Sequence, residues 1–259
     1  MERSAASWDA FYARHEDRFF LPRTYLERDF PLLLRARTRP FALLEFGCGT
    51  GACLLPLVER LPHLLATGFD LSHRAVGLAA AAAAACGATP RLCVFPGAAG
   101  DAAAPVAAAV GAAHAARPVG APSLLATPSG FDAVLLLFML SAAPPEAHGR
   151  VIAQAAACLR PGGCLLLRDY GAGDEAQGRF GKGSLLYADR GDVLVRRDGT
   201  LAAFLDLRVV RRLAAAAGLE ETGESRYLYR EYENRGTGEV LRRVFVHGVW
   251  RRPLSALMG

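Results

Sequence analysis

The fold of this chain is decided by the stretch Glu45-Phe46-Gly47-Cys48-Gly49-Thr50-Gly51, which closes the apolar run 42–46. The apolar run predicts a buried strand, and residues 52–61 have a pattern typical of a helix. Glycines between a strand and a helix allow a tight turn, and they let backbone N–H groups approach a ligand closely. We therefore predict a ligand-binding turn at this point in the chain.

An acidic residue stands where such a turn would use it. A second apolar run, 64–69, predicts a strand that ends at Asp70, about twenty residues beyond the glycines. A carboxylate in this place can accept hydrogen bonds from both hydroxyls of a bound ribose. The glycine turn and this acid together predict a cofactor that contains a nucleoside.

The spacing of the glycines separates two classes of cofactor. Gly47, Gly49 and Ala52 satisfy the G-x-G-x-x-G/A pattern of dinucleotide sites. Glu45, two residues before the first glycine, and Gly51, two residues after the second, instead fit the pattern E-x-G-x-G-x-G of a nucleoside–methionine site. We therefore predict S-adenosylmethionine as the cofactor, and we disfavour redox chemistry with NAD.

The rest of the pattern predicts an α/β fold. Further strands are expected over 91–95, 131–140 and 164–167, and further helices over 73–86 and 146–159. Strands that alternate with helices in this way form a parallel sheet covered on both faces. The strand-like runs 226–232 and 243–250 would add an antiparallel hairpin at one edge. We expect a Rossmann-like, mostly parallel seven-stranded sheet with this C-terminal hairpin.

Two segments depart from the α/β rhythm. Aromatic residues at helical spacing over 8–35 predict one or two amphipathic helices, so we separate an amino-terminal segment 1–40 from a domain 41–259. Residues 97–130 are rich in alanine, proline and glycine. That composition predicts a low-complexity surface insertion within the domain.

The composition excludes several classes of protein. Of the 259 residues, 52% are hydrophobic and 21% are charged, which excludes wholesale disorder. No apolar run is long enough to span a membrane, and the first residues lack the pattern of a secretory signal, so we expect a cytoplasmic location, with the nucleus as the alternative. The histidines and cysteines lack zinc-site spacing, so we predict no metal. The net charge of +5 permits an anionic partner.

The substrate side is indicated by residues after the fourth and fifth predicted strands. Arg168-Asp169-Tyr170-Gly171 follow the fifth strand, at the edge of the sheet where α/β folds bind ligands. The run 137–141 lacks the [ND]-P-P-[YFW] motif, which argues against methylation of an exocyclic amine of the adenine N6 type. Arginines in 171–200 and in the hairpin would suit a phosphate backbone, or they form a solvated edge.

These residues together resemble a known family, the eukaryotic tRNA 3-methylcytidine methyltransferases. The resemblance covers nearly the whole chain except 97–130. Beyond the glycine turn it rests on Trp8-Asp9-x-Phe11-Tyr12, Phe19-Phe20-x-x-Arg23, Asp70-x-Ser72-x-Arg74-Ala75, Phe138-x-Leu140-Ser141-Ala142, Arg168-Asp169-Tyr170-Gly171 and Val195-Arg196-x-Asp198-Gly199-Thr200.

The resemblance implies a class I methyltransferase fold, S-adenosylmethionine as cofactor, and formation of 3-methylcytidine at position 32 of the tRNA anticodon loop. It also implies that the segment 1–40 folds over the cofactor. An auxiliary protein such as an aminoacyl-tRNA synthetase is a candidate partner. The residues expected at the cofactor are Trp8, Tyr12, Glu45, Gly47, Gly49, Gly51, Asp70, Leu71 and Leu137.

The chain departs from the family after the third predicted strand. Family members usually have Cys-Asp-Leu there, and the aspartate meets the adenine amino group, whereas this chain has Pro96-Gly97-Ala98-Ala99. The nearest acid is Asp101, which becomes the candidate to replace it at the cofactor.

Methyl transfer to cytosine N3 requires positioning more than proton transfer, because N3 carries a free lone pair. We expect Asp169 to stabilise the cationic product, Tyr170 to orient the base, and Arg168 to complete this catalytic group. The candidates for contact with tRNA are Arg23, Arg196, Arg197 and Arg243. Two alternatives stay open: a small-molecule methyltransferase, and a catalytically weak partner subunit of another methyltransferase.

Overall fold

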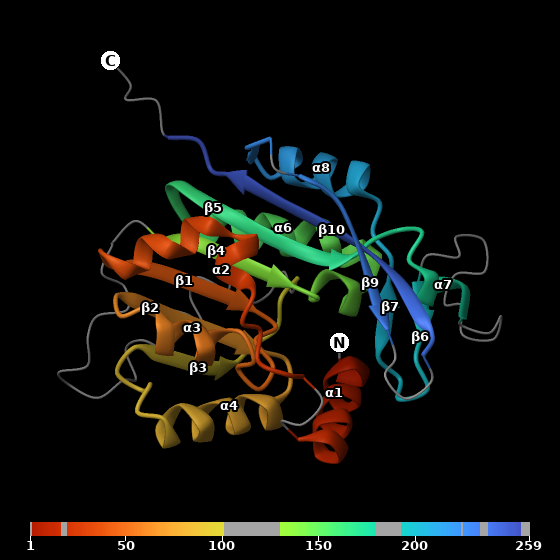
Figure 1. Ribbon diagram of the computed structural model, residues 1–259, viewed down its shortest axis with the longest axis horizontal. Coiled ribbons are helices and arrows are strands. Elements are labelled where there is room, and N and C mark those ends of the chain that lie inside the picture. The colour runs from red at the N-terminus through yellow and green to blue at the C-terminus, as the bar shows by residue number, and fades with distance from the viewer. Residues whose placement is uncertain are drawn as a thin grey trace.

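The computed structural model describes residues 2–16, 20–100, 130–179, 193–223, 225–233 and 238–254. A twisted sheet lies at the centre, with helices on both of its faces (Figure 1). Within these described ranges, no helix is both long and apolar enough to cross a membrane.

The sheet is mostly parallel, as predicted. Its strands are β1 (Phe41–Phe46), β2 (Leu64–Asp70), β3 (Leu92–Pro96), β4 (Phe131–Leu137), β5 (Leu159–Tyr170), β8 (Glu220–Glu221), β9 (Arg226–Glu233) and β10 (Val240–Arg251). They follow the order β3-β2-β1-β4-β5-β10-β8, and β9 also pairs with β10. The strands β1 to β5 run parallel, and β10 runs antiparallel to β5. Every residue of β1 is buried, because helices cover both faces of the sheet there.

The described part of the sheet has eight strands, where seven were expected. The difference lies beyond β10. The two-residue strand β8 pairs with Trp250 and Arg251, while β9 pairs with β10 from Val240 to His247. Because both strands lie on the side of β10 away from β5, they fill one position in the sheet between them.

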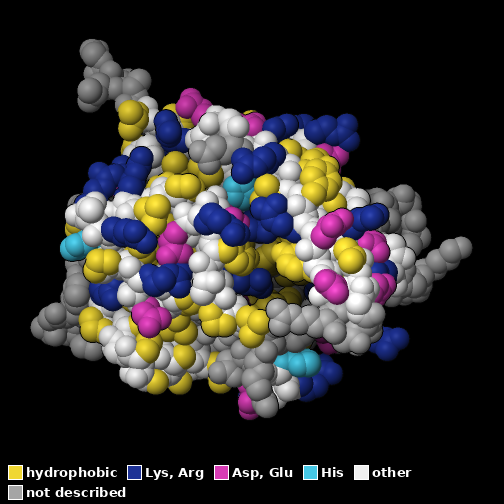
Figure 2. All heavy atoms as spheres, viewed as in Figure 1, with side chains coloured by type: hydrophobic (Ala, Val, Ile, Leu, Met, Phe, Trp, Pro, Cys, Tyr) yellow, Lys and Arg dark blue, Asp and Glu magenta, His cyan; other side chains and the backbone are white. Residues whose placement is uncertain are grey.

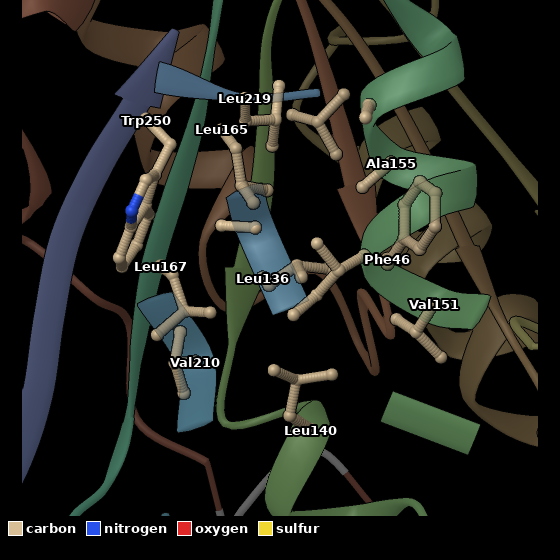
Figure 3. Packing of buried hydrophobic residues seen from close by; sticks show 14 of the residues in the cluster. Phe46, Leu136, Leu140, Val151, Ala155, Leu165, Leu167, Val210, Leu219 and Trp250 are labelled. Carbon is tan, nitrogen blue, oxygen red and sulfur yellow. The ribbon is translucent and has the colours of Figure 1, made fainter. Parts of the chain in front are cut away.

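Two hydrophobic cores sandwich the sheet. Behind it in the view of Figure 1 lie α6 (Pro145–Cys158) and α8 (Leu207–Ala216), and in front lie α2 (Leu26–Asp29), the 3-10 helix η1 (Pro31–Arg37) and α3 (Leu54–Arg60). Figure 3 shows the first core, where Phe46, Leu136 and Leu165 from three strands pack against Val151 and Ala155 of α6. Neighbouring residues of the same strands belong to the second core, because successive side chains point to opposite faces.

The predicted helix over 73–86 is confirmed as α4 (His73–Ala85). Its amino-terminal cap is Ser72, whose side-chain oxygen accepts a hydrogen bond from Ala75 N at 3.1 Å. A serine cap satisfies one of the backbone donors that a helix leaves free in its first turn. The predicted helix over 52–61 begins two residues later, at Leu54, as α3.

The strands β4 and β5 differ from the prediction at their ends. β4 ends at Leu137 and not at residue 140, because Phe138 has a left-handed backbone with φ of 53° and the 3-10 helix η2 (Leu140–Ala142) follows. β5 begins at Leu159 and continues through Tyr170. The register shifts between Phe131 and Ala133, which lets the longer strand absorb its Pro-Gly-Gly segment.

The remaining described elements lie outside the central sheet. They are α1 (Glu2–His15), α7 (Glu175–Arg179), and the two-stranded sheet formed by β6 (Val193–Val195) and β7 (Leu201–Ala203). The sequence pattern over 8–35 predicted one or two helices; α1 starts earlier and ends at His15, and α2 and η1 follow. Most of the predicted insertion 97–130, including Asp101, lies outside the described residues.

Candidate active site

A cavity of about 730 Å³ opens at the carboxyl ends of β1, β2 and β4, and α1 and the β6–β7 turn close its other side. This volume lies within the range of roughly 300–1,000 Å³ that is typical of small-ligand sites. Near the centre of Figure 2 a hollow lined by hydrophobic side chains is bordered by Lys and Arg side chains. The predicted site residues that line the cavity are Trp8, Tyr12, Arg23, Glu45, Gly47, Gly49, Asp70, Leu71 and Leu137.

The glycine turn forms the floor of the cavity. Gly47 and Cys48 donate backbone hydrogen bonds to the Phe69 carbonyl oxygen at 2.8 and 3.0 Å, which fixes the turn to β2. Gly49 has φ of 52°, and a Cβ placed on it would lie 2.7 Å from the Tyr12 hydroxyl oxygen. Glycine is therefore required here both by backbone conformation and by the close approach of α1. Gly51 also has a left-handed backbone, with φ of 83°, but it does not line the cavity.

Asp70 is held rigidly at the edge of the cavity. Its carboxylate accepts hydrogen bonds from Gly49 N at 2.8 Å and from Ser72 N at 2.9 Å. Burial raises the pKa of Asp70, and these hydrogen bonds oppose that shift. The sequence motif thus fixes both the turn and the acid in one hydrogen-bonded unit.

Glu45 presents a carboxylate with one unpartnered oxygen to the cavity. The residue is 2% exposed, and its Oε2 atom has no hydrogen-bond partner. Burial raises the pKa of Glu45 to about 8; a hydrogen bond with the Cys53 side chain opposes the shift, and the negative charge of Asp70 adds to it. A buried polar atom without a partner is costly, so a bound cation at this point would be stabilised strongly.

The helix α1 covers this end of the cavity. Asp9 accepts a hydrogen bond from the Ser72 hydroxyl at 2.5 Å and one from Arg74 N at 3.2 Å, which anchors α1 to the start of α4. Trp8 and Tyr12 lie one helical turn apart, with ring centroids 6.0 Å from each other, and both line the cavity. The aromatic spacing that predicted an amphipathic helix therefore places two rings on the cavity side.

The loop after β3 contributes backbone to the cavity at the place where the family resemblance implies an acid. Gly97 to Gly100 line the cavity, and the loop is held by two side chains of α6. Arg150 donates from Nε to the Gly100 carbonyl oxygen at 2.8 Å, and Gln154 accepts from Gly100 N at 2.7 Å. Arg150 also lines the cavity, and no motif in the sequence indicated this role. The structure does not describe Asp101.

The end of the cavity away from Glu45 is formed by the turn after β4. Leu137, Phe138 and Met139 line the cavity, and β5 holds this turn in place. Phe138 N donates to the Arg168 carbonyl oxygen at 2.9 Å, and Ser141 N donates to the Asp169 carboxylate at 2.9 Å.

Asp169 stands behind this turn and does not line the cavity. It is fully buried, and its carboxylate also accepts a hydrogen bond from Tyr170 N at 2.8 Å. Burial raises the pKa of Asp169 to about 6. Because Asp169 belongs to β5, its side chain points to the face opposite those of Arg168 and Tyr170, so the three catalytic candidates are not brought together.

Tyr170 belongs to an aromatic wall beside the turn. Its ring centroid lies 5.0 Å from that of Phe138, and the Arg243 guanidinium lies 5.0 Å from the Tyr170 ring centroid. Arg243 is oriented by Asp174, whose two carboxylate oxygens accept from Nε at 2.9 and 2.8 Å. Arg23 lies over the ring of Phe138, with its guanidinium 5.1 Å from the ring centroid. Phe138 connects the cavity to this wall, and from the run 137–141 the sequence analysis named only Leu137 as a site residue.

Three further predicted site residues lie away from the cavity. Arg168 is buried and ion-paired to Asp29, with its guanidinium between the rings of Tyr25 and Phe245, each 4.9 Å away. Arg196 closes the β6–β7 turn through a 2.6 Å hydrogen bond to the Leu201 carbonyl oxygen, and Arg197 is exposed beside it.

In the described residues no group of three His, Cys, Asp or Glu side chains is placed to bind a metal.

Comparison with known proteins identifies the family. A family model described as a methyltransferase domain matches residues 13–222. The tRNA N(3)-cytidine methyltransferase METTL6 of Mus musculus is 33% identical over 252 residues, which cover 95% of this chain and 80% of the mouse protein. The tRNA N(3)-methylcytidine methyltransferase trm141 of Schizosaccharomyces pombe is 32% identical over 257 residues, which cover 97% of this chain and 93% of that protein.

The chain belongs to the tRNA N(3)-cytidine methyltransferase family. Members of this family are enzymes that use S-adenosylmethionine, which confirms the predicted class of enzyme and its cofactor. The fold agrees with this family, because a solved S-adenosylmethionine-dependent methyltransferase from Anabaena variabilis superposes with a TM-score of 0.63. That structure is 15% identical in sequence, and the match covers 96% of this chain and 94% of the other.

Proposed function

We propose that this protein transfers the methyl group of S-adenosylmethionine to N3 of a cytidine in tRNA, at position 32 of the anticodon loop. The observation that carries the proposal is the similarity to two tRNA N(3)-cytidine methyltransferases over 95% or more of this chain. The cavity supports it, because Glu45, which suits a cationic ligand, and the aromatic ring of Phe138 line the same cavity.

The residues that line the Glu45 end of the cavity suit the cofactor. We propose that the unpartnered Oε2 atom of Glu45 accepts a hydrogen bond from the ammonium group, and that the fixed Asp70 carboxylate accepts hydrogen bonds from the ribose hydroxyls. Gly47 and Gly49 let the cofactor lie against the backbone, and Trp8, Tyr12, Leu71 and Leu137 cover its apolar parts.

When bound, S-adenosylmethionine supplies an electrophilic methyl group: the N3 lone pair forms the new N–C bond as the C–S bond breaks, which leaves a neutral thioether and a cationic 3-methylcytidine. No proton moves, so the protein has to position the base and exclude water. Phe138 offers the ring on which the cytosine can stack, and Arg23 can donate a hydrogen bond to the O2 atom beside N3. Tyr170 supports Phe138 from behind.

We assign Asp169 and Arg168 positions behind this surface. Asp169 holds the backbone of Ser141 and Arg168 holds the backbone of Phe138, so both fix the turn that carries the stacking ring. The Asp169 carboxylate also contributes a fixed negative charge near the turn, which favours the cationic product. The target base must leave its stack to enter the cavity, and a loop nucleotide does so at low cost.

The decisive experiment is a nucleoside mass analysis of unmethylated tRNA after incubation with the protein and S-adenosylmethionine. We expect new 3-methylcytidine, and none in a matched tRNA that carries uridine at position 32. The reaction is run with and without an aminoacyl-tRNA synthetase, the auxiliary partner that we propose, and tagged protein is located in cells to test the proposed cytoplasmic or nuclear site of action. Protein that binds the cofactor but forms no 3-methylcytidine under either condition would contradict the proposed function.

A further inference from the structure

The cavity extends past Asp70 to the loop after β3. The strand order β3-β2-β1 places the glycine turn, Asp70 and the loop 97–100 at the ends of successive strands. Gly97 N donates to the Asp70 backbone carbonyl oxygen at 2.9 Å, which joins the loop to the acid. In the proposed placement of the cofactor, with its ammonium group at Glu45 and its ribose at Asp70, the base lies at this loop.

We call this part of the cavity, which is lined by residues 97–100, residues 142–144, Ala147 and Arg150, the base end. Most of its side chains are small, because the loop is two alanines between two glycines and the other residues are alanine or proline except Arg150. The loop packs directly on α6: a Cβ on Gly100 would lie 3.1 Å from the Val151 side chain and 3.4 Å from that of Ala147. The base end is therefore a narrow apolar slot with one polar side chain.

Arg150 is that polar side chain. Among the described residues that line the base end, no other side chain carries a charge and none is an acid. Its Nε atom donates to the Gly100 carbonyl oxygen at 2.8 Å, which fixes the guanidinium beside the loop and leaves the two terminal nitrogens without a partner among the described residues. A guanidinium has donors and no acceptor, so the base end presents donors and no carboxylate.

The 6 position of a purine responds differently to such a wall. An oxo group at this position is an acceptor and matches arginine, whereas an amino group is a donor and matches a side-chain amide such as that of glutamine. Arg150 is exposed, so the cavity is open to water beside it, and an amino group there can bond to water. The base end therefore accommodates a 6-amino group without recognising it.

We propose that the base end holds the purine of the cofactor by its shape and by the donors of Arg150, and that it does not select the 6-amino group. A cofactor that carries hypoxanthine in place of adenine then binds about as tightly as the adenine form. A site rejects an analogue strongly only where it is built to hydrogen-bond the group that the analogue lacks, and the described base end has no acid for that bond. The proposal rests on the proposed placement of the cofactor and not on the identity of the methyl acceptor.

The test measures binding of S-adenosylhomocysteine and S-inosylhomocysteine to the full chain by titration calorimetry. For the wild type we expect the two dissociation constants to agree within about threefold, which is less than one charge-assisted hydrogen bond contributes. Arg150→Gln should shift their ratio about tenfold toward S-adenosylhomocysteine, because glutamine offers an acceptor to the amino group and removes the donors that suit the oxo group.

Two control variants separate recognition from support of the loop. Gln154→Ala removes the other side chain that holds Gly100, and it should weaken both ligands alike without changing their ratio. Arg23→Gln removes the same charge from the opposite end of the cavity, over Phe138, and it should also leave the ratio unchanged. An equal shift of the ratio in Gln154→Ala and Arg150→Gln would make Arg150 a support of the loop alone and overturn the proposal.

A wild-type preference for S-adenosylhomocysteine beyond about threefold, or a ratio that Arg150→Gln leaves unchanged, would also overturn the proposal. Loss of such a preference in Asp101→Asn would assign the selection of adenine to Asp101. The nucleoside analysis separates these results from the fate of the proposed function. Formation of 3-methylcytidine with a strong adenine preference would leave the function standing and remove the proposal, and equal binding of the two ligands without 3-methylcytidine would support the proposal and contradict the reaction.

Discussion

The two ends of the cavity are built in different ways. At the cofactor end, the turn from Glu45 to Gly49 and the acid Asp70 are short, local features that backbone hydrogen bonds lock together. At the proposed substrate end, Phe138 is oriented by the backbone of a neighbouring strand, and that strand is in turn tied to α2 by the buried Arg168–Asp29 pair. Local geometry therefore determines the first end, and contacts between distant parts of the chain determine the second.

This difference separates binding from catalysis. Changes to the glycine turn should act on cofactor affinity, while changes behind the turn that carries Phe138 should act on stability and on methyl transfer. The predictions below test this separation from the largest expected effect to the smallest.

Asp29→Ala should cost the most in stability. It leaves the Arg168 guanidinium buried without its counter-ion, and breaking a buried pair in this way costs about 3–5 kcal/mol. Glu231→Ala is the control, because Glu231 and its partner Arg242 are 68% and 80% exposed and such pairs contribute about 1 kcal/mol or less. Urea unfolding measures both, and equal losses would refute the special role of the buried pair.

Gly49→Ala should abolish tight cofactor binding while the fold survives. The new Cβ would lie 2.7 Å from the Tyr12 hydroxyl, and a left-handed alanine adds about 1–2 kcal/mol of strain. We expect affinity to fall about 100-fold, or ~3 kcal/mol. Gly77→Ala, in the helix α4 and with open space around it, should instead stabilise the protein by about 0.5–1 kcal/mol. Titration calorimetry and thermal unfolding test the two variants, and unchanged affinity in Gly49→Ala would contradict the geometry.

Cofactor binding should strengthen as pH rises from 6 to 7.5. The pKa of Glu45 is raised to about 8, so the free protein holds it protonated over this range, and an arriving ammonium group favours the ionised form. Binding should therefore release a proton, and affinity should rise up to about tenfold per pH unit. Glu45→Gln should flatten this profile. Calorimetry in buffers of different ionisation enthalpy counts the proton, and a profile that is equally steep in Glu45→Gln would assign the proton to another group.

The same contrast explains how much could be read from the sequence. The glycine turn and Asp70 were predicted from the residues themselves, because they depend on short spacing and on the ends of strands that are easy to recognise. The cavity positions of Trp8 and Tyr12 in α1 were expected from the family resemblance. The arrangement around Asp169 was not predicted. The face that a side chain takes depends on whether its residue belongs to a strand, and β5 extends beyond the apolar run 164–167 through Tyr170.

Two further features depend on contacts that no local pattern encodes. Arg150 reaches the cavity from α6 to hold a loop some fifty positions earlier in the chain, through its bond to Gly100. The short β6–β7 sheet was missed, because each of its two strands is only three residues long.

The separation of the two ends is tested most directly by Phe138→Leu, with Phe138→Tyr as the variant that keeps a ring. The measurement is the rate of 3-methylcytidine formation in a single turnover at saturating S-adenosylmethionine, together with cofactor affinity for each protein. The account predicts that Phe138→Leu binds cofactor like the wild type and loses most of its methyl transfer, which Phe138→Tyr retains. Loss of cofactor affinity in step with transfer, or transfer that survives in Phe138→Leu, would contradict it.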